Sequence, residues 1–223
     1  MLRKLFVKSR QVHFLHIGKC GGSAVKDLAE RINKLPTGPS IVTHGHSTKL
    51  QHLPQGDPYF FAIRNPVTRF YSAFYMRKRK EQPRLYREWK DSERDAYTHF
   101  AEANDLAENL FAKTPLGHQA FAAMQSIGHM SYQHTLFRIR EILQSRPPLC
   151  ILRQENLDND VNSLLIKLNI ADDLKLPDDK KIAHRNDYSS TPQPSEAAIN
   201  NLERWYAVDI EYYRLINDWI ENN

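Results

Sequence analysis

The sequence predicts an α/β fold in which helices flank a central parallel sheet. Short apolar runs of strand character alternate along the chain with longer segments of helical periodicity, and this alternation is typical of parallel α/β proteins. The 223 residues suffice for one hydrophobic core and are too few for two large ones. We therefore expect residues 1–223 to form a single domain.

The composition is that of an ordinary globular protein, with 41% hydrophobic and 26% charged residues. It excludes collagens, coiled coils and fully disordered chains. No apolar run approaches the roughly 18–20 residues that span a bilayer, and the N-terminus has no apolar signal core. The formal net charge of +5 suits an anionic ligand but is too small to indicate nucleic acid.

Four short strands are expected from their aliphatic and aromatic residues. They cover residues 12–17, 41–44, 59–63 and 149–153. The third of them contains only aromatic and aliphatic residues, so we expect it to lie in the middle of the sheet.

Helical periodicity covers much of the remaining chain. Helices are expected over residues 23–34, 66–80, most of 95–145, 157–168 and from 194 onward. Gly117 and Gly128 are expected to break the long helical stretch, and residues 81–94 and 171–194 to be irregular. An apolar stripe near the C-terminus is expected to belong to the core: Trp205, Tyr212, Ile216 and Trp219.

The strongest chemical signal lies where the first strand turns into the first helix, at residues 16–24. Gly21 and Gly22 allow backbone N–H groups to turn inward, and the helix N-terminus adds its dipole. Lys19 adds a positive charge and Ser23 a hydroxyl, so the segment is suited to a phosphate-like group. It is not a Walker A loop, because Lys19 precedes the glycines. The alternative is a tight turn with an exposed lysine.

A second signal follows the third strand. Arg64 ends that strand at the sheet edge where α/β proteins bind ligands, and Asn65 and Pro66 are suited to begin a helix. Ser72 lies on the helix face opposite the apolar one and can point back toward the strand end. Arg64 and Ser72 would suit a second phosphate. The alternative is a capped amphipathic helix with a solvated basic face.

Together the two segments resemble PAPS-dependent sulfotransferases of the carbohydrate branch. That branch commonly carries a 5′-phosphosulfate loop written H-I-P-K-T-G-G-T-S, and residues 16–24 read H-I-G-K-C-G-G-S-A. Its 3′-phosphate motif is R-[DN]-P with a serine eight residues after the arginine, as at Arg64 and Ser72. Weaker similarities lie at residues 153–157 and 205–209, so the resemblance touches most of the chain.

The resemblance implies a three-layer αβα architecture with a central parallel sheet, the P-loop-NTPase-like sulfotransferase fold. Two residues depart from the family pattern, since Gly18 replaces the usual proline and Cys20 the usual threonine. Cys20 removes a hydroxyl donor but keeps the backbone N–H groups that do most of the binding.

The resemblance also implies that PAPS is the donor, that PAP is the product and that no metal is needed. The phosphosulfate would bind the first segment, through Lys19, Cys20, Gly21, Gly22, Ser23 and Ala24. The 3′-phosphate would bind Arg64 and Ser72. Arg185 and Asn186, in the late polar loop, would cover the 3′-phosphate and the adenine.

By the same resemblance, the sulfuryl group would pass in line to a hydroxyl acceptor, which we expect to be a carbohydrate. Lys19 would stabilise the leaving phosphate. We expect His46 to be the base, with His44 orienting it or contacting the substrate, because the uronyl 2-O-sulfotransferase branch carries a similar H-G-H with a catalytic histidine. Glu155 is the second choice of base. The alternative is that the two histidines are loop residues without a catalytic role.

Two other function classes stay open. A P-loop kinase or another nucleotide phosphotransferase would need ATP and Mg²⁺, and a non-catalytic protein would bind PAP or a glycan without turnover. The basic run at residues 77–80 is expected to be a solvated helix end, with contact to an acidic glycan as the alternative.

The expected partner is a hydroxyl-bearing small molecule or glycan, with no nucleic acid and no membrane span. The two cysteines, Cys20 and Cys150, form neither a disulfide framework nor a zinc set, which favours a reducing compartment. A cytoplasmic enzyme of bacterial type is therefore expected, or a Golgi-lumen enzyme if the chain is a fragment without its anchor. The oligomeric state stays open.

Overall fold

The computed structural model describes residues 11–83, 85–127, 132–171, 174–176 and 191–223. The chain divides into two compact units. The first comprises Met1–Ile63 and Arg140–His184, and the second comprises Arg64–Ile139 and Arg185–Asn223. The single domain expected from the sequence stays a prediction.

The described part of the first unit is built on a sheet of four parallel strands in the order β2-β1-β3-β4. The strands are β1 (Gln11–Leu15), β2 (Ser40–His44), β3 (Tyr59–Ile63) and β4 (Cys150–Arg153). Every residue of β3 is buried, and β3 has a strand on each side, which confirms the expected central strand. Because the strands are parallel, their carboxyl ends share one edge of the sheet.

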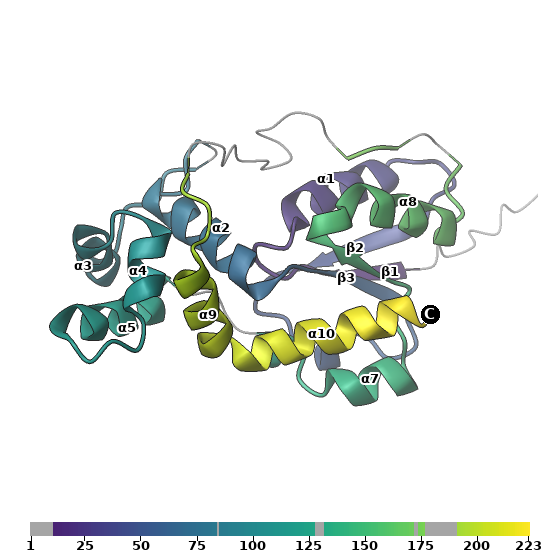
Figure 1. The fold of residues 1–223 in the computed structure, drawn as a ribbon. Helices are drawn as coiled ribbons and strands as arrows, with labels where there is room; N and C mark the ends of the chain where they lie inside the picture. Colours follow the sequence, from purple (N-terminus) through teal and green to yellow (C-terminus); the bar gives the residue numbers. More distant parts are fainter. Residues whose placement is uncertain (1–10, 84, 128–131, 172–173, 177–190) are drawn as a thin grey trace, which may run out of the picture. The chain divides into compact units, whose positions relative to one another are not determined.

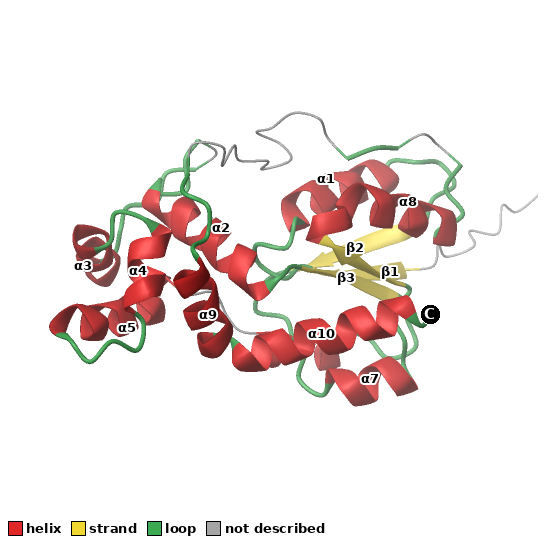
Figure 2. Ribbon diagram, viewed as in Figure 1, coloured by secondary structure: helices red, strands yellow, loops and turns green. Residues whose placement is uncertain are grey.

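Helices cover both faces of this sheet. α1 (Gly22–Ile32) and α8 (Leu157–Lys167) lie on one face (Figure 1). α7 (Ile139–Ser145), of which all but the first residue belongs to this unit, lies on the other. Figure 2 shows the yellow strands between these helices. The buried face of α1 has the spacing that predicted the helix, with Ala24, Val25, Leu28, Ala29 and Ile32.

Two short 3-10 turns complete the first unit. They are η1 (Leu50–His52) and η2 (Gln154–Asn156). The layered α/β architecture predicted from the alternation of strands and helices is thus confirmed.

The described part of the second unit is helical. Its helices are α2 (Pro66–Lys78), α3 (Asp91–His99), α4 (Ala103–Asn109), α5 (Pro115–Ile127), α6 (Tyr132–Thr135), α9 (Glu196–Trp205) and α10 (Ala207–Glu221). Apolar side chains of α2, α3, α4, α5 and α9 form one core, to which α2 contributes Phe70 and Phe74 and α4 contributes Leu106. Burying each of these side chains stabilises the unit by about 1.5–3 kcal/mol.

α2 begins where the sequence predicts. The side chain of Asn65 accepts from the N–H groups of Val67 and Thr68, and Pro66 occupies the first helical position. Pro66 has no N–H to leave unsatisfied there. The start of this helix is therefore encoded locally.

Several predicted boundaries were wrong. β1 ends at Leu15 rather than at Ile17, because its ladders to β2 and β3 end at Leu15. α1 begins at Gly22 rather than at Ser23. α3 begins at Asp91, inside the segment expected to be irregular, because the Glu93 carboxylate accepts from the backbone N–H of Lys90 at 2.9 Å and so caps the start of the helix.

Gly117 does not break a helix. It lies in the first turn of α5, where its N–H donates to Oγ1 of Thr114 at 3.1 Å. A Cβ on Gly117 would lie 2.0 Å from the carbonyl oxygen of Ala112, so glycine serves close packing here. Gly128 lies outside the described residues. In the C-terminal stripe, Ile216 is fully buried and Tyr212 and Trp219 are half-buried.

Candidate active site

The segment between β1 and α1 contains two residues with a left-handed backbone, Lys19 (φ 66°) and Gly21 (φ 80°). Gly21 is the N-cap of α1, no side chain caps the helix there, and the first turn has no acidic residue. The first N–H groups of a helix carry partial positive charge and need an acceptor. The segment therefore ends in a helix N-terminus suited to an anion, two residues after the cationic Lys19.

Gly21 and Gly22 are each required by a close neighbour. A Cβ on Gly22 would lie 2.0 Å from Cδ2 of His16, and a Cβ on Gly21 would lie 2.8 Å from Cδ2 of Leu157. The left-handed backbone of Gly21 would also cost another residue about 1–2 kcal/mol. The glycines thus let the segment pack against the His16 ring and the first residue of α8.

The side chains predicted to bind the donor differ in exposure. Cys20 and Ala24 are buried, and Sγ of Cys20 donates to the carbonyl of Gly18 at 3.5 Å. These two residues can offer a ligand only their backbone groups. Lys19 and Ser23 are partly exposed, so their side chains are within reach of solvent.

His46 follows β2 and contacts the same segment. Its Nδ1 lies 3.0 Å from the carbonyl oxygen of His16, and a Cβ on Gly18 would lie 3.7 Å from that Nδ1. A carbonyl can only accept, so Nδ1 carries the proton and Nε2 of the neutral ring keeps its lone pair. Since His46 is exposed, this lone pair is suited to accept a proton from a substrate.

His44, the last residue of β2, belongs to another chain of hydrogen bonds. Its Nε2 lies 2.9 Å from Nδ1 of His13, and Nε2 of His13 lies 3.2 Å from Oδ2 of Asp57. Partial burial, and then the neighbouring His13, hold the pKa of His44 below its ordinary value. Within the described residues it is the His16 carbonyl, and not His44, that hydrogen-bonds His46.

In the second unit, Arg64 is held by Tyr132. The Arg64 N–H donates to the Tyr132 hydroxyl at 2.8 Å, and that hydroxyl donates to the Arg64 carbonyl. Nε of Arg64 donates to Oγ1 of Thr68 at 3.0 Å. The backbone and the side chain of the residue predicted to bind the 3′-phosphate are therefore both fixed.

The helix face that carries Arg69 and Ser72 is not solvated, since these residues are only 6% and 5% exposed. The solvated basic face that was one reading of the sequence is therefore wrong for both. The Arg69 guanidinium lies 4.6 Å from the Tyr132 ring centroid and 3.8 Å from Oδ2 of Asp209. Asp209 Oδ1 accepts from the Tyr132 N–H at 3.0 Å, and burial raises the pKa of this carboxyl. Arg69 is buried because it anchors Tyr132 together with Asp209.

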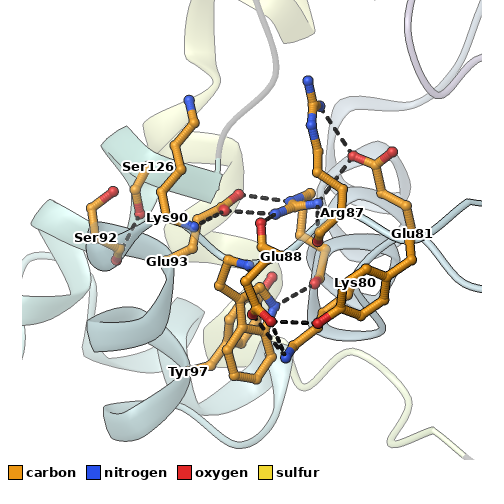
Figure 3. A network of polar contacts seen from close by, with 12 residues as sticks. Lys80, Glu81, Arg87, Glu88, Lys90, Ser92, Glu93, Tyr97 and Ser126 are labelled. Atoms are coloured by element: carbon orange, nitrogen blue, oxygen red, sulfur yellow. Dashed lines mark hydrogen bonds and ion pairs between the residues drawn. The ribbon is translucent and has the colours of Figure 1, made fainter.

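The basic run at residues 77–80 is not the solvated helix end that the sequence predicts. Nε and Nη2 of Arg77, which is 6% exposed, donate to the two carboxylate oxygens of Glu93 at 2.7 and 2.6 Å. Nζ of Lys80 lies 2.8 Å from Oε1 of Glu88 (Figure 3). Acidic residues that follow the run in sequence form ion pairs with Arg77, Lys78 and Lys80.

Three predicted residues remain. Glu155, the second choice of base, is exposed in η2. Arg185 and Asn186 lie outside the described residues.

A family model described as the sulfotransferase family matches residues 4–215. The chain belongs to the sulfotransferase family. No curated protein and no solved structure matched the chain. Family membership makes the protein a sulfuryl transferase by class, and the four-stranded parallel sheet between helices fits the αβα fold expected of a sulfotransferase.

In the described part of this sulfotransferase, no helix is long and apolar enough to cross a membrane. The same residues contain no group of three or more histidine, cysteine or acidic side chains that could hold a metal ion. Cys20 and Cys150 are buried and are not joined in a disulfide, and the reducing compartment stays a prediction.

Sequence reasoning did not single out three residues of this sulfotransferase that contact the predicted site residues: His13, Asp57 and Tyr132. His13 gave a usable signal, because a polar side chain inside an apolar strand needs a buried partner. Asp57 and Tyr132 gave none, since their partners are 44 and 68 residues away in the sequence.

Proposed function

We propose that this sulfotransferase takes its sulfuryl group from PAPS and transfers it to a hydroxyl group of a carbohydrate. The observation that carries the proposal is the N-terminus of α1, which has no side-chain cap and no acidic residue in its first turn, and which follows Lys19. A helix N-terminus with a neighbouring lysine is suited to the phosphosulfate group. PAPS fits these residues without a metal ion, because they supply the positive charge themselves.

The 3′-phosphate of the donor is proposed to bind Arg64 and Ser72. Arg64 directly follows Ile63, the last residue of β3. Its backbone N–H and its carbonyl are both hydrogen-bonded to the Tyr132 hydroxyl. An arginine held in this way is well suited to bind a phosphate with two parallel hydrogen bonds. Arg185 and Asn186 are proposed to cover the adenine end of the donor.

For the chemical step, we propose His46 as the base. Its Nε2 accepts the proton of the acceptor hydroxyl while that oxygen bonds to sulfur and the bond from sulfur to the phosphate oxygen breaks. Lys19 and the first N–H groups of α1 stabilise the charge that develops on the leaving phosphate. PAPS supplies the activated sulfuryl group, so the protein contributes position, charge and a proton acceptor.

The carbohydrate acceptor rests on the resemblance of the His44-Gly45-His46 segment to the uronyl 2-O-sulfotransferase branch. His46 is exposed and His44 is half-buried. A hydroxyl at the edge of a sugar could therefore approach His46 from solvent.

The donor can be tested by thermal unfolding with PAP, PAPS, ATP and ADP, each with and without Mg²⁺. Ligand at 100 times its Kd should stabilise the folded protein by about 2.7 kcal/mol. We expect PAP and PAPS to raise Tm without Mg²⁺, and Arg64→Ala and Ser72→Ala to weaken this shift. Arg214→Ala, which removes an exposed arginine of α10, is the matched control.

The other outcomes separate the competing functions. A shift with ATP alone that needs Mg²⁺ would identify a nucleotide phosphotransferase and refute the proposal. A PAP shift without sulfation of any member of a panel of mono- and oligosaccharides with free hydroxyls would identify a non-catalytic PAP-binding protein. Sulfation is followed as transfer of ³⁵S from labelled PAPS.

A further inference from the structure

When both imidazole rings are neutral, the chain formed by His44, His13 and Asp57 can run in only one direction. The carboxylate of Asp57 can only accept, so Nε2 of His13 must donate to it. Nδ1 of the neutral His13 ring is then an acceptor, so Nε2 of His44 must donate to it. The lone pair of a neutral His44 is therefore on Nδ1, an atom for which the described residues provide no hydrogen-bond partner.

His13 occupies an unusual place for an ionisable group. It lies in the middle of β1 between Val12 and Phe14 and is 2% exposed. A buried imidazole without partners would cost about 1–3 kcal/mol. Both of its ring nitrogens are bonded instead, one to each neighbour in the chain, so His13 transmits the orientation of Asp57 to His44.

Asp57 is itself held from the other side. Nη2 of Arg146 donates to the Asp57 carbonyl at 2.9 Å and to the Pro54 carbonyl at 2.6 Å. The Arg146 guanidinium also lies 4.7 Å from the ring centroid of Tyr59. Arg146 therefore holds the turn before β3 in place. The Asp57 carboxylate keeps a fixed position, from which it orients the rings of His13 and His44.

We propose that Asp57 and His13 are positioning residues that hold His44 in the tautomer protonated at Nε2, so that Nδ1 of His44 receives a hydrogen bond from the acceptor substrate. This deepens the proposed function and rests on it for the identity of the acceptor. Burial, the larger cause of the lowered pKa of His44, agrees with it, because burial favours the neutral ring that keeps the Nδ1 lone pair. His44 and His46 then offer opposite ring nitrogens to the same substrate, since His46 carries its proton on Nδ1.

The direct test is the tautomer of His44, read from long-range ¹H–¹⁵N correlations of the imidazole rings in the full-length protein. We expect a single His44 tautomer with an unprotonated Nδ1. In Asp57→Asn, the new side-chain amide can donate to Nε2 of His13. Nδ1 of His13 then carries the proton and donates to Nε2 of His44, so His44 shifts toward the tautomer protonated at Nδ1. Asp57→Asn is preferred to a His13 variant because the Asp57 side chain is 42% exposed and its replacement leaves the core intact.

Kinetics supply the second readout. Asp57→Asn should lower kcat for sulfuryl transfer by about tenfold or more, because an acceptor hydroxyl that His44 no longer positions is less often in line with the sulfuryl group. The Tm shift produced by PAP should not change. Asp27→Asn, which alters a half-buried carboxylate of α1 paired with Arg31, is the matched control and should leave both the tautomer and kcat unchanged.

The two readouts separate this inference from the proposed function. If the wild-type protein neither binds PAP nor transfers sulfuryl groups, the proposed function fails. The tautomer measurement still decides whether Asp57 and His13 set the tautomer of His44. If His44 has the same tautomers in the wild type and in Asp57→Asn, or carries its proton on Nδ1 in the wild type, the inference is overturned. An unchanged kcat in Asp57→Asn overturns the role in substrate positioning.

Discussion

The hydroxyl of Tyr132 hydrogen-bonds both polar groups of the Arg64 backbone, accepting from the N–H at 2.8 Å and donating to the carbonyl. Tyr132 is the first residue of α6, and Arg64 lies between β3 and α2. One phenol thus satisfies the donor and the acceptor of a residue that belongs to neither element. This bond fixes the point from which the Arg64 side chain extends.

Tyr132→Phe removes that bond and leaves the ring. We expect it to lower the free energy of unfolding by about 1–3 kcal/mol, because the partly buried N–H and carbonyl of Arg64 lose the Tyr132 hydroxyl, and to weaken PAP binding. Tyr97→Phe is the matched control, because the Tyr97 hydroxyl donates to the buried Phe74 carbonyl at 2.9 Å. Denaturant unfolding and PAP titration measure both effects. Equal PAP affinity in Tyr132→Phe and the wild type would show that Arg64 needs no such support.

Gly22→Ala tests the packing of the candidate donor segment. The new methyl would overlap the His16 ring, so we expect a loss of about 1–3 kcal/mol in stability and a lower kcat, because His16 also holds His46. Gly45→Ala has open space around its new Cβ, and its stability should stay within about 0.5 kcal/mol of the wild type. Similar unfolding curves for Gly22→Ala and Gly45→Ala would contradict the close contact between Gly22 and the His16 ring.

Lys19→Met tests the charge at the start of α1. Losing a cation that stabilises the leaving phosphate should reduce kcat by about 10²–10³-fold. Lys26→Met removes an exposed lysine of α1 that pairs with Glu30 and should keep normal turnover. If Lys19→Met also turns over normally, Lys19 has no part in the chemistry.

His46→Gln tests the proposed base. We expect kcat to fall by about 10²–10⁴-fold, while the Tm shift with PAP is kept. His52→Gln changes an exposed histidine bonded to Gln51 at 3.3 Å and serves as the control. A normal kcat in His46→Gln combined with a large loss in Glu155→Gln would transfer the role of base to Glu155.

Glu93→Gln tests the buried pair with Arg77. Breaking one side of a buried ion pair costs about 3–5 kcal/mol, because it leaves an uncompensated charge. Burial works to raise the pKa of Glu93, but hydrogen bonds from Arg77 and Lys90 outweigh it and hold the pKa below the ordinary 4.5. Glu211→Gln, in an exposed pair with Arg214, should change stability by less than about 1 kcal/mol.

The stability lost in Glu93→Gln depends on pH in a definite direction. Because the pKa of Glu93 is lower in the folded protein than in the unfolded chain, its contribution is complete above pH 4.5 and is lost as the pH falls through the folded value. The stability difference between the wild type and Glu93→Gln should therefore shrink as the pH falls below 4.5. Denaturant unfolding from pH 7 downward measures it, and a difference that grows in acid would contradict the assignment.

The sequence by itself determined the features that depend on neighbouring residues. The apolar runs at β1 and β3, the glycine-containing turn into α1 and the start of α2 at Asn65 and Pro66 follow from local preferences for strand, turn and helix. The two motifs at residues 16–24 and 64–72 were enough to suggest the family, which the match over residues 4–215 shows. The helix that begins at Asp91 was missed, because its cap, the hydrogen bond from the Lys90 N–H to Glu93, lies in a charged stretch without apolar periodicity.

Only the tertiary structure decided which polar side chains meet. Arg69 reads in the sequence as a surface residue of an amphipathic helix, but it is buried against Tyr132 and lies 3.8 Å from an oxygen of Asp209. His13 and Asp57 come together because β1 pairs with β3. A charge is buried only when a partner from a distant part of the chain compensates for its lost hydration, and no local pattern encodes where that partner will lie.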